Sequence, residues 1–502
     1  MKTTNSRNKV SIFEKSCYGA SGFGIGLTRN MIGIYLLFYY ADVIGLSPAY
    51  ISLAIMIGNV WDAITDPLMG FISDHTHTRW GRRRVYILGA ALPLGVLVFL
   101  TWAPPSGLMG LPLFVYVSVL LAFLYAAFTV VCVPQLALGA ELSSDADERS
   151  SIFGFSFAFT RFGELCGAIV PNVAIEFSDD IIRFLHAKAG LFSEEFTANA
   201  ISYFSQQTNA FKWTAAFMGI VITLGAVTTF LGTHERVPHE PERRSLKGAQ
   251  GFKTLYGDLF GTLKSRPFFL LLMAMTTIDI GSGITGSMMM FATEYWLKMA
   301  DKVSLFYATY MAFAMGAAIF WVQFSKRTSK KMAYLLGQAI LTVGLFATFF
   351  MAEGKFLRVF ALLAFNGFGL GAYVMLWSLV ADIVDYDEYA THKRREGAYY
   401  GVYTLFSKTA YGIGVFITGL YLKLIGFEKG VEITPEILFR IKLLFGPLTA
   451  LINLAGVAIF FFFHYDKKEH EGIQRELALR KARLSEECAV TAGHNDADGL
   501  DR

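Results

Sequence analysis

Long apolar segments recur along almost the whole chain, and no other feature constrains its fold as strongly. An α-helix needs roughly 20 consecutive apolar residues to cross a bilayer. Segments of this length include residues 120–140, 213–232 and 443–463. Charged residues make up only 17% of the 502-residue chain, whereas they make up about 25% of a typical soluble domain. The sequence therefore predicts a polytopic helical membrane protein.

Charged breaks between the apolar segments predict twelve transmembrane helices, and so an all-α membrane protein. The first segment is too long for the apolar core of a signal peptide, and we expect it to be retained. The predicted helices span residues 18–44, 48–73, 85–103, 111–139, 151–176, 211–233, 267–296, 304–325, 332–352, 356–384, 396–424 and 438–464.

An internal similarity predicts that these helices form two six-helix halves. Residues 139–150, after the fourth helix, resemble residues 380–397, after the tenth. Two related halves are typical of secondary transporters, in which the substrate site lies between them near mid-membrane. The predicted division is an N-terminus (1–17), a first half (18–233), a cytoplasmic linker (234–266), a second half (267–464) and a partly disordered tail (465–502).

Basic residues concentrate in the loops that follow even-numbered helices, as in residues 79–84 after the second helix. By the positive-inside rule these loops are cytoplasmic. The mostly acidic loop at 141–150 is an exception, but acidic residues contribute little to the rule. We therefore expect a multi-pass protein of the inner or plasma membrane with both termini in the cytoplasm.

Two carboxylates, Asp62 and Asp66, stand one helical turn apart inside an apolar segment. Asn59 shares their helix face, and Thr65 is adjacent. In a low dielectric the two acids repel each other unless a cation or a proton lies between them. This pattern predicts a site for a coupling ion, H⁺ or Na⁺. The alternative is that each acid only pairs with a buried arginine or lysine.

Other ionisable residues in the predicted helices are functional candidates, because such residues are rare in membranes. Arg161 and Glu164, three residues apart, could form a self-contained ion pair or take part in gating. Lys408 is a lone cation whose natural partners are the acids of the second helix. The remaining candidates are Arg29, Asp279 and Asp382.

Several other functions are disfavoured by the sequence. Residues 281–286 read G-x-G-x-x-G but lie in a predicted membrane helix with no strand before them, so a nucleotide site is not expected. The chain has no P-loop and no nucleophile–base set, which argues against an ATP-driven pump and against an enzyme. We expect no cofactor beyond the coupling ion, no structural metal and no nucleic-acid partner. The expected partners of this predicted monomer are a small-molecule substrate and the lipid bilayer.

The loop at 70–84 resembles the signature of the major facilitator superfamily: a glycine, an acid four residues later and a basic Gly-Arg-Arg turn. Taken with WDAITDPLMG (61–70), YYADVIGLS (39–47) and residues 381–408, it resembles the glycoside–pentoside–hexuronide:cation symporter family. The resemblance covers residues 10–465. It implies a major facilitator fold, and cation-coupled transport of a sugar by alternating access.

The resemblance also implies roles for individual residues. Asp62 and Asp66 would bind the cation, with Asn59 and Thr65 beside them, and Lys408 would link the cation and sugar sites. The implied substrate contacts are Arg161, Lys408, Gly26, Cys132 and Trp377. The residues expected to hold the cytoplasmic side closed are Asp74, Arg82, Arg83, Arg84, Glu141 and Asp382.

Some positions depart from the family pattern. Ile25 and Gly26 stand where the best-known member has a Lys-Asp pair that includes the sugar-binding acid. Cys132 replaces a third cation-site aspartate, and Leu136 replaces a sugar-stacking tryptophan. A thiol is a poor ligand for a hard cation, so we expect H⁺ to be favoured over Na⁺. The predicted substrate is a sugar, glycoside or hexuronide. The alternatives are an amphipathic solute such as a lysophospholipid, or a transport-inactive sensor.

Overall fold

The computed structural model describes residues 10–76, 78–143, 145–176, 207–236, 257, 259–392, 395–464, 472–477 and 479. Within these residues every regular element is a helix. The first group comprises α1 (Ile12–Phe38) with its extension η1 (Tyr39–Ile44), α2 (Pro48–Asp74), α3 (Arg84–Trp102), α4 (Gly110–Glu141), α5 (Ala146–Glu176) and α8 (Gln207–Gly232).

The second group of helices also contributes six spans. It comprises η2 (Thr262–Lys264), α10 (Arg266–Phe291) with η3 (Ala292–Leu297), η4 (Ala300–Lys302), α11 (Val303–Arg327), α12 (Lys330–Thr348), α13 (Phe356–Leu370) with η5 (Gly371–Tyr373) and α14 (Val374–Thr391), α15 (Glu396–Leu424), and α16 (Pro435–Leu443) with η6 (Leu444–Leu448) and α17 (Thr449–Phe461). Joined end to end where they are continuous, the described helices supply the twelve predicted spans.

Ten of these spans are long and apolar enough to cross a membrane by composition alone. The two that fall short are α1, which is rich in glycine, and α2, which carries Asp62 and Asp66. Both helices have the length of a span, 27 residues each. Both helices carry buried polar or charged residues, among them Glu14 and Lys15 of α1 and Asn59 and Asp62 of α2.

Helix boundaries differ from the predicted ones mainly at two places. The first helix begins at Ile12 rather than residue 18, because the Ser11 hydroxyl accepts a hydrogen bond from the Glu14 amide and caps the helix. The tenth span continues to Thr391, past the predicted end at 384. The predicted N-terminus, linker and tail lie largely outside the described residues, so their boundaries stay predictions.

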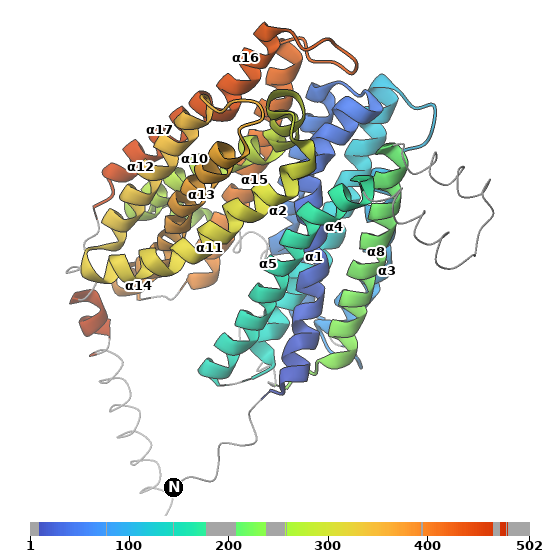
Figure 1. Ribbon diagram of the computed structural model, residues 1–502. Coiled ribbons are helices and arrows are strands. Elements are labelled where there is room, and N and C mark those ends of the chain that lie inside the picture. The colour runs from blue at the N-terminus through green and yellow to red at the C-terminus, as the bar shows by residue number, and fades with distance from the viewer. Residues whose placement is uncertain are drawn as a thin grey trace, which may run out of the picture.

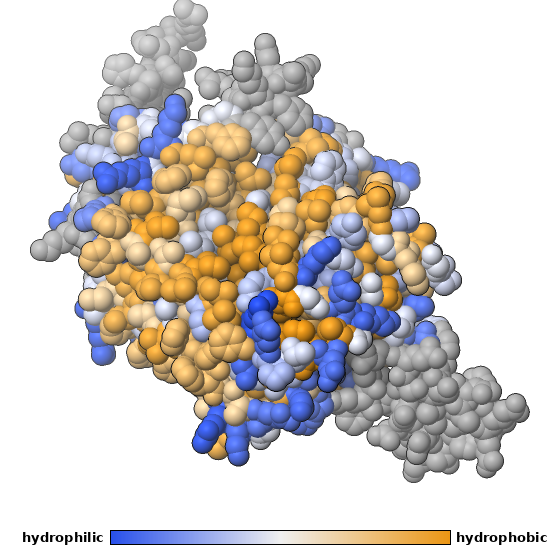
Figure 2. Space-filling model, turned by 90° about the horizontal axis from the view of Figure 1, so that it is seen from above, coloured by the Kyte–Doolittle hydropathy of each residue, from blue (hydrophilic) through white to orange (hydrophobic). Residues whose placement is uncertain are grey.

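Figure 1 shows the two groups of helices side by side, converging at the end that carries α16 and diverging toward the end where the N-terminus lies. In the first group α1 packs on α5 and α8, and in the second α10 packs on α15 and α17. Contacts of α2 with α15, α1 with α10 and α5 with α11 join the groups. Figure 2 shows the molecule from above, where hydrophobic residues cover much of the surface and hydrophilic residues gather in patches between them.

Direct backbone contact through glycines recurs in both groups. A Cβ added to Gly26 of α1 would lie 2.2 Å from the Thr160 carbonyl oxygen of α5. A Cβ added to Gly283 of α10 would lie 2.3 Å from the Tyr411 carbonyl oxygen of α15. Small residues let membrane helices approach in this way. Since α1 with α5 and α10 with α15 are the first and fifth spans of each group, the two groups use the same packing device.

This packing predicts that Gly26→Leu destabilises the protein. The added side chain has no space between α1 and α5, so we expect a loss of about 1–3 kcal/mol or more, as for overpacked cores. Thermal unfolding in detergent measures the effect. Gly316→Leu on α11 is the matched control, because a Cβ there meets nothing within 4 Å. Equal stability of the two variants would contradict the packing role of Gly26.

Candidate functional site

The two predicted acids face α4 and α15 from one side of α2. Asp62 is 1% exposed, and Asp66 lies one turn further along the helix. The hydroxyl of Thr129 on α4 is 2.6 Å from Asp62 Oδ1 and 3.0 Å from Asp66 Oδ1, so it can donate to either. Thr65 Oγ1 lies 3.2 Å from the same hydroxyl. One threonine of α4 therefore bridges the acid pair.

Two cations, Lys408 and Arg29, contact these acids. Lys408 Nζ of α15 is 2.5 Å from Asp66 Oδ2 and 2.8 Å from Asp62 Oδ2. The Arg29 guanidinium of α1 is 2.7 Å from Asp62 Oδ2. We call Arg29, Asp62, Asp66, Thr129 and Lys408 the charge cluster. Its two acids and two cations cancel in formal charge, which removes the repulsion that the acids would otherwise suffer.

Each acid pairs with an arginine or lysine, as the alternative reading of the sequence predicted. The lysine comes from the other group of helices, so this pairing is more than local packing. Lys408 lies 342 positions after Asp66 and comes from the second group of helices. The ion pairs thus join the two groups at their contact surface. Removing one partner of a buried pair leaves an uncompensated charge, at a cost of about 3–5 kcal/mol.

Asn59 and Cys132 lie at the edge of the charge cluster. The Asn59 amide donates to the Ile55 carbonyl at 2.9 Å and to the Tyr125 hydroxyl at 3.3 Å. Cys132 follows Thr129 on α4 and is close enough to interact electrostatically with both cations of the cluster. Neither residue has a direct contact with the two carboxylates, whose described partners are Arg29, Lys408 and Thr129.

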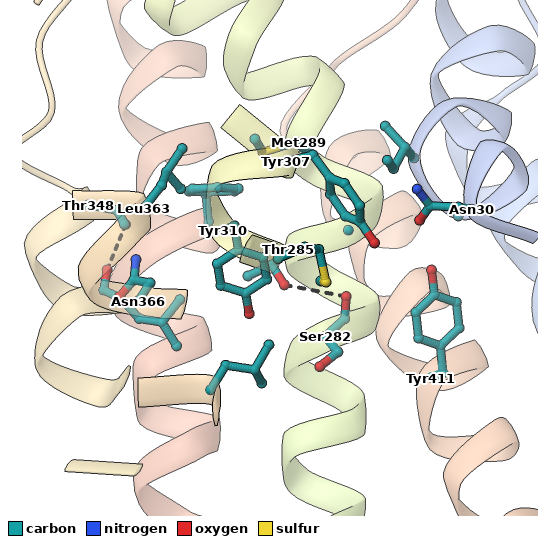
Figure 3. Close-up of a pocket in the computed structure, with 17 residues that line it drawn as sticks. Asn30, Ser282, Thr285, Met289, Tyr307, Tyr310, Thr348, Leu363, Asn366 and Tyr411 are labelled. Carbon is teal, nitrogen blue, oxygen red and sulfur yellow. Dashed lines mark hydrogen bonds between the residues drawn. The ribbon is translucent and has the colours of Figure 1, made fainter. Parts of the chain in front are cut away.

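One cavity adjoins the charge cluster, and a second cavity shares part of its wall with the first. The charged cavity, of about 260 Å³, has Arg29, Lys408 and Asp279 in its wall, together with Asn59 and Tyr125. The uncharged cavity, of about 220 Å³, is shown in Figure 3, and no Asp, Glu, Lys, Arg or His is among its described lining residues. Gly33 and Tyr411 line both. The two cavities are therefore neighbours, one polar and ionic and one neutral.

Asp279 of α10 is a further acid in the wall of the charged cavity. Its Oδ1 accepts a hydrogen bond of 3.1 Å from the Tyr373 hydroxyl, which lies 2.7 Å from the Tyr403 hydroxyl. Its Oδ2 is buried and has no hydrogen-bond partner among the described residues. Asp279 thus stands apart from the ion pairs of the charge cluster.

The other predicted substrate contacts lie away from both cavities. Arg161 Nη1 is 2.6 Å from Glu164 Oε2 and its guanidinium lies over the Phe157 ring, so these residues form the self-contained pair that their spacing predicted. Gly26 lies in the close contact between α1 and α5. Trp377 of α14 packs edge-on against Tyr403 with ring centroids 4.5 Å apart. None of these three is among the residues that line the two cavities.

The predicted gating residues form ion pairs within each group of helices. Arg83 contacts Asp74 and lies 3.2 Å from Glu141, to which Arg82 also pairs at 2.6 Å. The Arg84 guanidinium donates to the Phe230 carbonyl at 2.6 Å. These contacts tie the ends of α2, α3, α4 and α8 together. In the second group, Asp382 pairs with Lys330 at 2.6 Å and joins α14 to α12.

Polar contacts between the two groups lie at the opposite end. Asn172 of α5 donates to the Asp301 carbonyl at 3.0 Å, and Lys429 donates to the Val43 carbonyl at 2.6 Å. The Tyr295 hydroxyl of η3 donates to Asp42 of η1. Sequence reasoning did not single out these residues, because polar residues at helix ends are common. They close this end of the molecule.

A family model for MFS/sugar transport proteins matches residues 17–467. This chain belongs to that family. The match confirms the resemblance to the glycoside–pentoside–hexuronide:cation symporters and the major facilitator fold, and it makes the protein a transporter rather than an enzyme.

Relatives in this family transport different solutes. An uncharacterised symporter of Synechocystis is 26% identical over 96% of this chain and 99% of its own length. The sodium-dependent lysophosphatidylcholine symporter 1 of Mus musculus is 23% identical over 98% of this chain and 92% of its own. The isoprimeverose transporter of Lactiplantibacillus pentosus is 23% identical over 91% of this chain and 89% of its own length.

The fold is shared with a distantly related solved structure. A bacterial homologue of the human lysosomal transporter Spinster superposes with a TM-score of 0.65 over 90% of this chain and 95% of its own, at 12% identity. Identity this low supports the arrangement of helices alone. The contacts of this chain's own residues, and not this similarity, place the charge cluster between the two groups of helices.

The charge cluster predicts strong coupling between Lys408 and Asp66. Lys408→Met leaves two buried acids with one cation, and we expect it to lower stability by about 3–5 kcal/mol. Adding Asp66→Asn removes the uncompensated charge and should restore much of this loss, giving a coupling energy of about 1–3 kcal/mol in a double-mutant cycle. Thermal or chemical unfolding at neutral pH measures the four proteins.

Lys330→Met is the control for this cycle, since it breaks the more exposed pair with Asp382 within one group of helices. We expect it to cost less than Lys408→Met. Additive effects of Lys408→Met and Asp66→Asn would show that the two residues do not depend on each other.

Proposed function

We propose that this transporter is a cation-coupled symporter that carries a sugar, glycoside or hexuronide by alternating access. The observation that carries the proposal is the position of Lys408, whose ammonium contacts both acids of α2 from the other group of helices. Ion coupling requires a site whose charge state alters the contact between the two halves of a carrier. The charge cluster has this property.

Asp66 is the proposed ion-responsive acid. Asp62 keeps Arg29 as a partner on its own side of the molecule, whereas Asp66 has Lys408 as its closest cation. A proton on Asp66, or Na⁺ between the acids, removes the charge that holds Lys408. The contact between α2 and α15 then weakens, and the population shifts toward a state in which the halves separate here.

The surroundings of the acids favour H⁺ as the coupling ion. Cys132 supplies sulfur where a hard cation prefers oxygen, which leaves the two carboxylates, Thr129, Thr65 and Asn59 as candidate ligands for Na⁺. The sodium dependence of the mouse lysophosphatidylcholine symporter supports Na⁺ as the second candidate.

A glycoside is the favoured substrate. The isoprimeverose transporter supports a saccharide, and both cavities mix hydroxyl or amide groups with apolar walls, which suits a neutral polyhydroxylated solute. The mouse relative supports a lysophospholipid as the alternative. A transport-inactive sensor is disfavoured by the intact acid pair. Arg161 and Trp377 are proposed to contact the substrate in another state of the cycle.

The membrane orientation is part of the proposal. With both termini in the cytoplasm of an inner or plasma membrane, the end closed by Asn172, Tyr295 and Lys429 faces outward. The structure then represents a state closed to the outside. The pairs formed by Asp74, Arg82 to Arg84, Glu141 and Asp382 brace the inner ends of each half, and in the opposite state these ends come together.

Uptake into proteoliposomes tests this function. We expect isoprimeverose or a related neutral glycoside to accumulate when the outside is acidic, or when Na⁺ is added if that ion is used. Asp66→Asn should abolish ion-driven accumulation while leaving exchange of solute across the membrane, because the variant mimics a neutralised acid. Asp387→Asn, which breaks an ion pair with Arg395 within one half, is the control.

Accumulation of lysophosphatidylcholine but of no glycoside would move the substrate to the lipid alternative. Equal accumulation by the wild type and by Asp66→Asn would contradict the assignment of the coupling ion to the acid pair.

A further inference from the structure

The uncharged cavity lies in the second group of helices and reaches α1 (Figure 3). Its labelled tyrosines are Tyr307 and Tyr310 of α11 and Tyr411 of α15, which surround Ser282 and Thr285 of α10. The apolar part of the wall comes from residues of six elements: Ile34, Met289, Met311, Leu345, Leu363, Leu370 and Phe445. The cavity therefore has aromatic, aliphatic and hydroxyl surface and carries no charge.

Several polar groups in this wall lack protein partners. The hydroxyls of Tyr307, Tyr310 and Tyr411 form no hydrogen bond with the described residues, whereas Thr285 and Thr348 donate to carbonyls of their own helices. Asn366 of α13 also lines the cavity, but its Oδ1 packs against Gly344 of α12, where an added Cβ would lie 1.9 Å from it. Buried polar groups are normally satisfied, so this wall is suited to a ligand that supplies hydrogen bonds.

The size of the cavity limits what it can hold. At about 220 Å³ it is larger than the cavity of about 150 Å³ that is known to hold a benzene ring. This is room for one ring-sized group. A charged group would find no counter-charge in the wall, and an unpaired charge in an apolar site is costly.

We propose that the uncharged cavity is a subsite that binds one neutral, hydroxyl-bearing ring of the transported solute while the rest of the solute occupies the charged cavity. Gly33 and Tyr411 line both cavities, and a Cβ added to Gly33 would lie 2.8 Å from the Tyr411 hydroxyl, so a solute that spans both cavities displaces this hydroxyl from Gly33. The tyrosine rings give the sugar face a stacking surface and their hydroxyls meet its hydroxyls. The proposal rests on the proposed transport function and specifies the solute as a glycoside of at least two units.

An acyl chain fits the same wall less well. A chain supplies no donor or acceptor, so it would leave the three tyrosine hydroxyls without partners while displacing water from them. Binding of a lysophospholipid here is therefore a contrary outcome of the test.

Filling the cavity is the direct test. Gly286 lines it, and a Cβ added there would meet the Tyr411 hydroxyl at 3.5 Å, which is ordinary contact, so Gly286→Leu places a side chain in the cavity without a backbone clash. Gly316→Leu, in open space, is again the matched control. Tyr310→Phe removes one hydroxyl and keeps the ring. The probes are isoprimeverose, D-xylose and lysophosphatidylcholine, titrated by thermal shift on the purified full-length protein.

We expect isoprimeverose to stabilise the wild type and Gly316→Leu equally and to bind Gly286→Leu at least tenfold more weakly. Tyr310→Phe should weaken it about fivefold, the effect of one lost hydrogen bond. D-xylose should lose less than isoprimeverose in Gly286→Leu, because a single unit can remain in the charged cavity.

Unchanged isoprimeverose affinity in Gly286→Leu would overturn the subsite. So would stabilisation of the wild type by lysophosphatidylcholine alone, with that effect lost in Gly286→Leu. Failure of the proposed transport function would be recognised separately. In that case the thermal stability of the wild type would not respond to pH or Na⁺ in the absence of any solute.

Discussion

The contact of the Lys408 ammonium with the carboxylates of α2 is the interaction on which the rest of the structure depends. Acids inside membrane helices need a partner or a proton, because hydrocarbon offers no solvation. Asp62 and Asp66 obtain one cation from α1 and one from α15. The cation from α15 belongs to the other half of the molecule. The contact that neutralises the acids therefore also holds the two halves together.

Packing within each half brings α1 onto α5 and α10 onto α15 at backbone distance through glycines, and such contacts leave little freedom for change. One contact between the halves is equally close, since a Cβ added to Gly419 of α15 would lie 2.3 Å from the Pro48 carbonyl oxygen of α2. The other contacts between the halves are ion pairs, cavity walls and polar contacts at one end, which can be exchanged for water. This arrangement suits halves that rock about the α2–α15 contact. The uncharged cavity lies beside this site, so a solute bound in it would contact the moving surface.

Much of this fold could be predicted from the sequence, since apolar length and charged breaks report membrane spans directly. Asp62, Asp66 and Lys408 were also within reach, because acids and a lysine are conspicuous in apolar helices. The pairing of Arg29 with Asp62 was not, since the sequence does not show which neighbouring helix, 33 positions away, the arginine faces. Thr129 was missed because a threonine in a membrane helix has no distinctive signal; only its place three residues before Cys132 could have pointed to it.

The most direct test of the account is a distance measured between the halves as the ion site is titrated. Spin labels at exposed positions 80 and 332 report on the same end of the two halves, in a background where Cys132 is replaced by alanine and the other three cysteines by serine, so that no oxygen ligand is added beside the acids. The account predicts that acidification, or Na⁺, shifts the distance distribution of the wild type. Asp66→Asn should show the shifted distribution at every pH. A distribution that responds to neither pH, Na⁺ nor Asp66→Asn would contradict the coupling of the charge cluster to the movement of the halves.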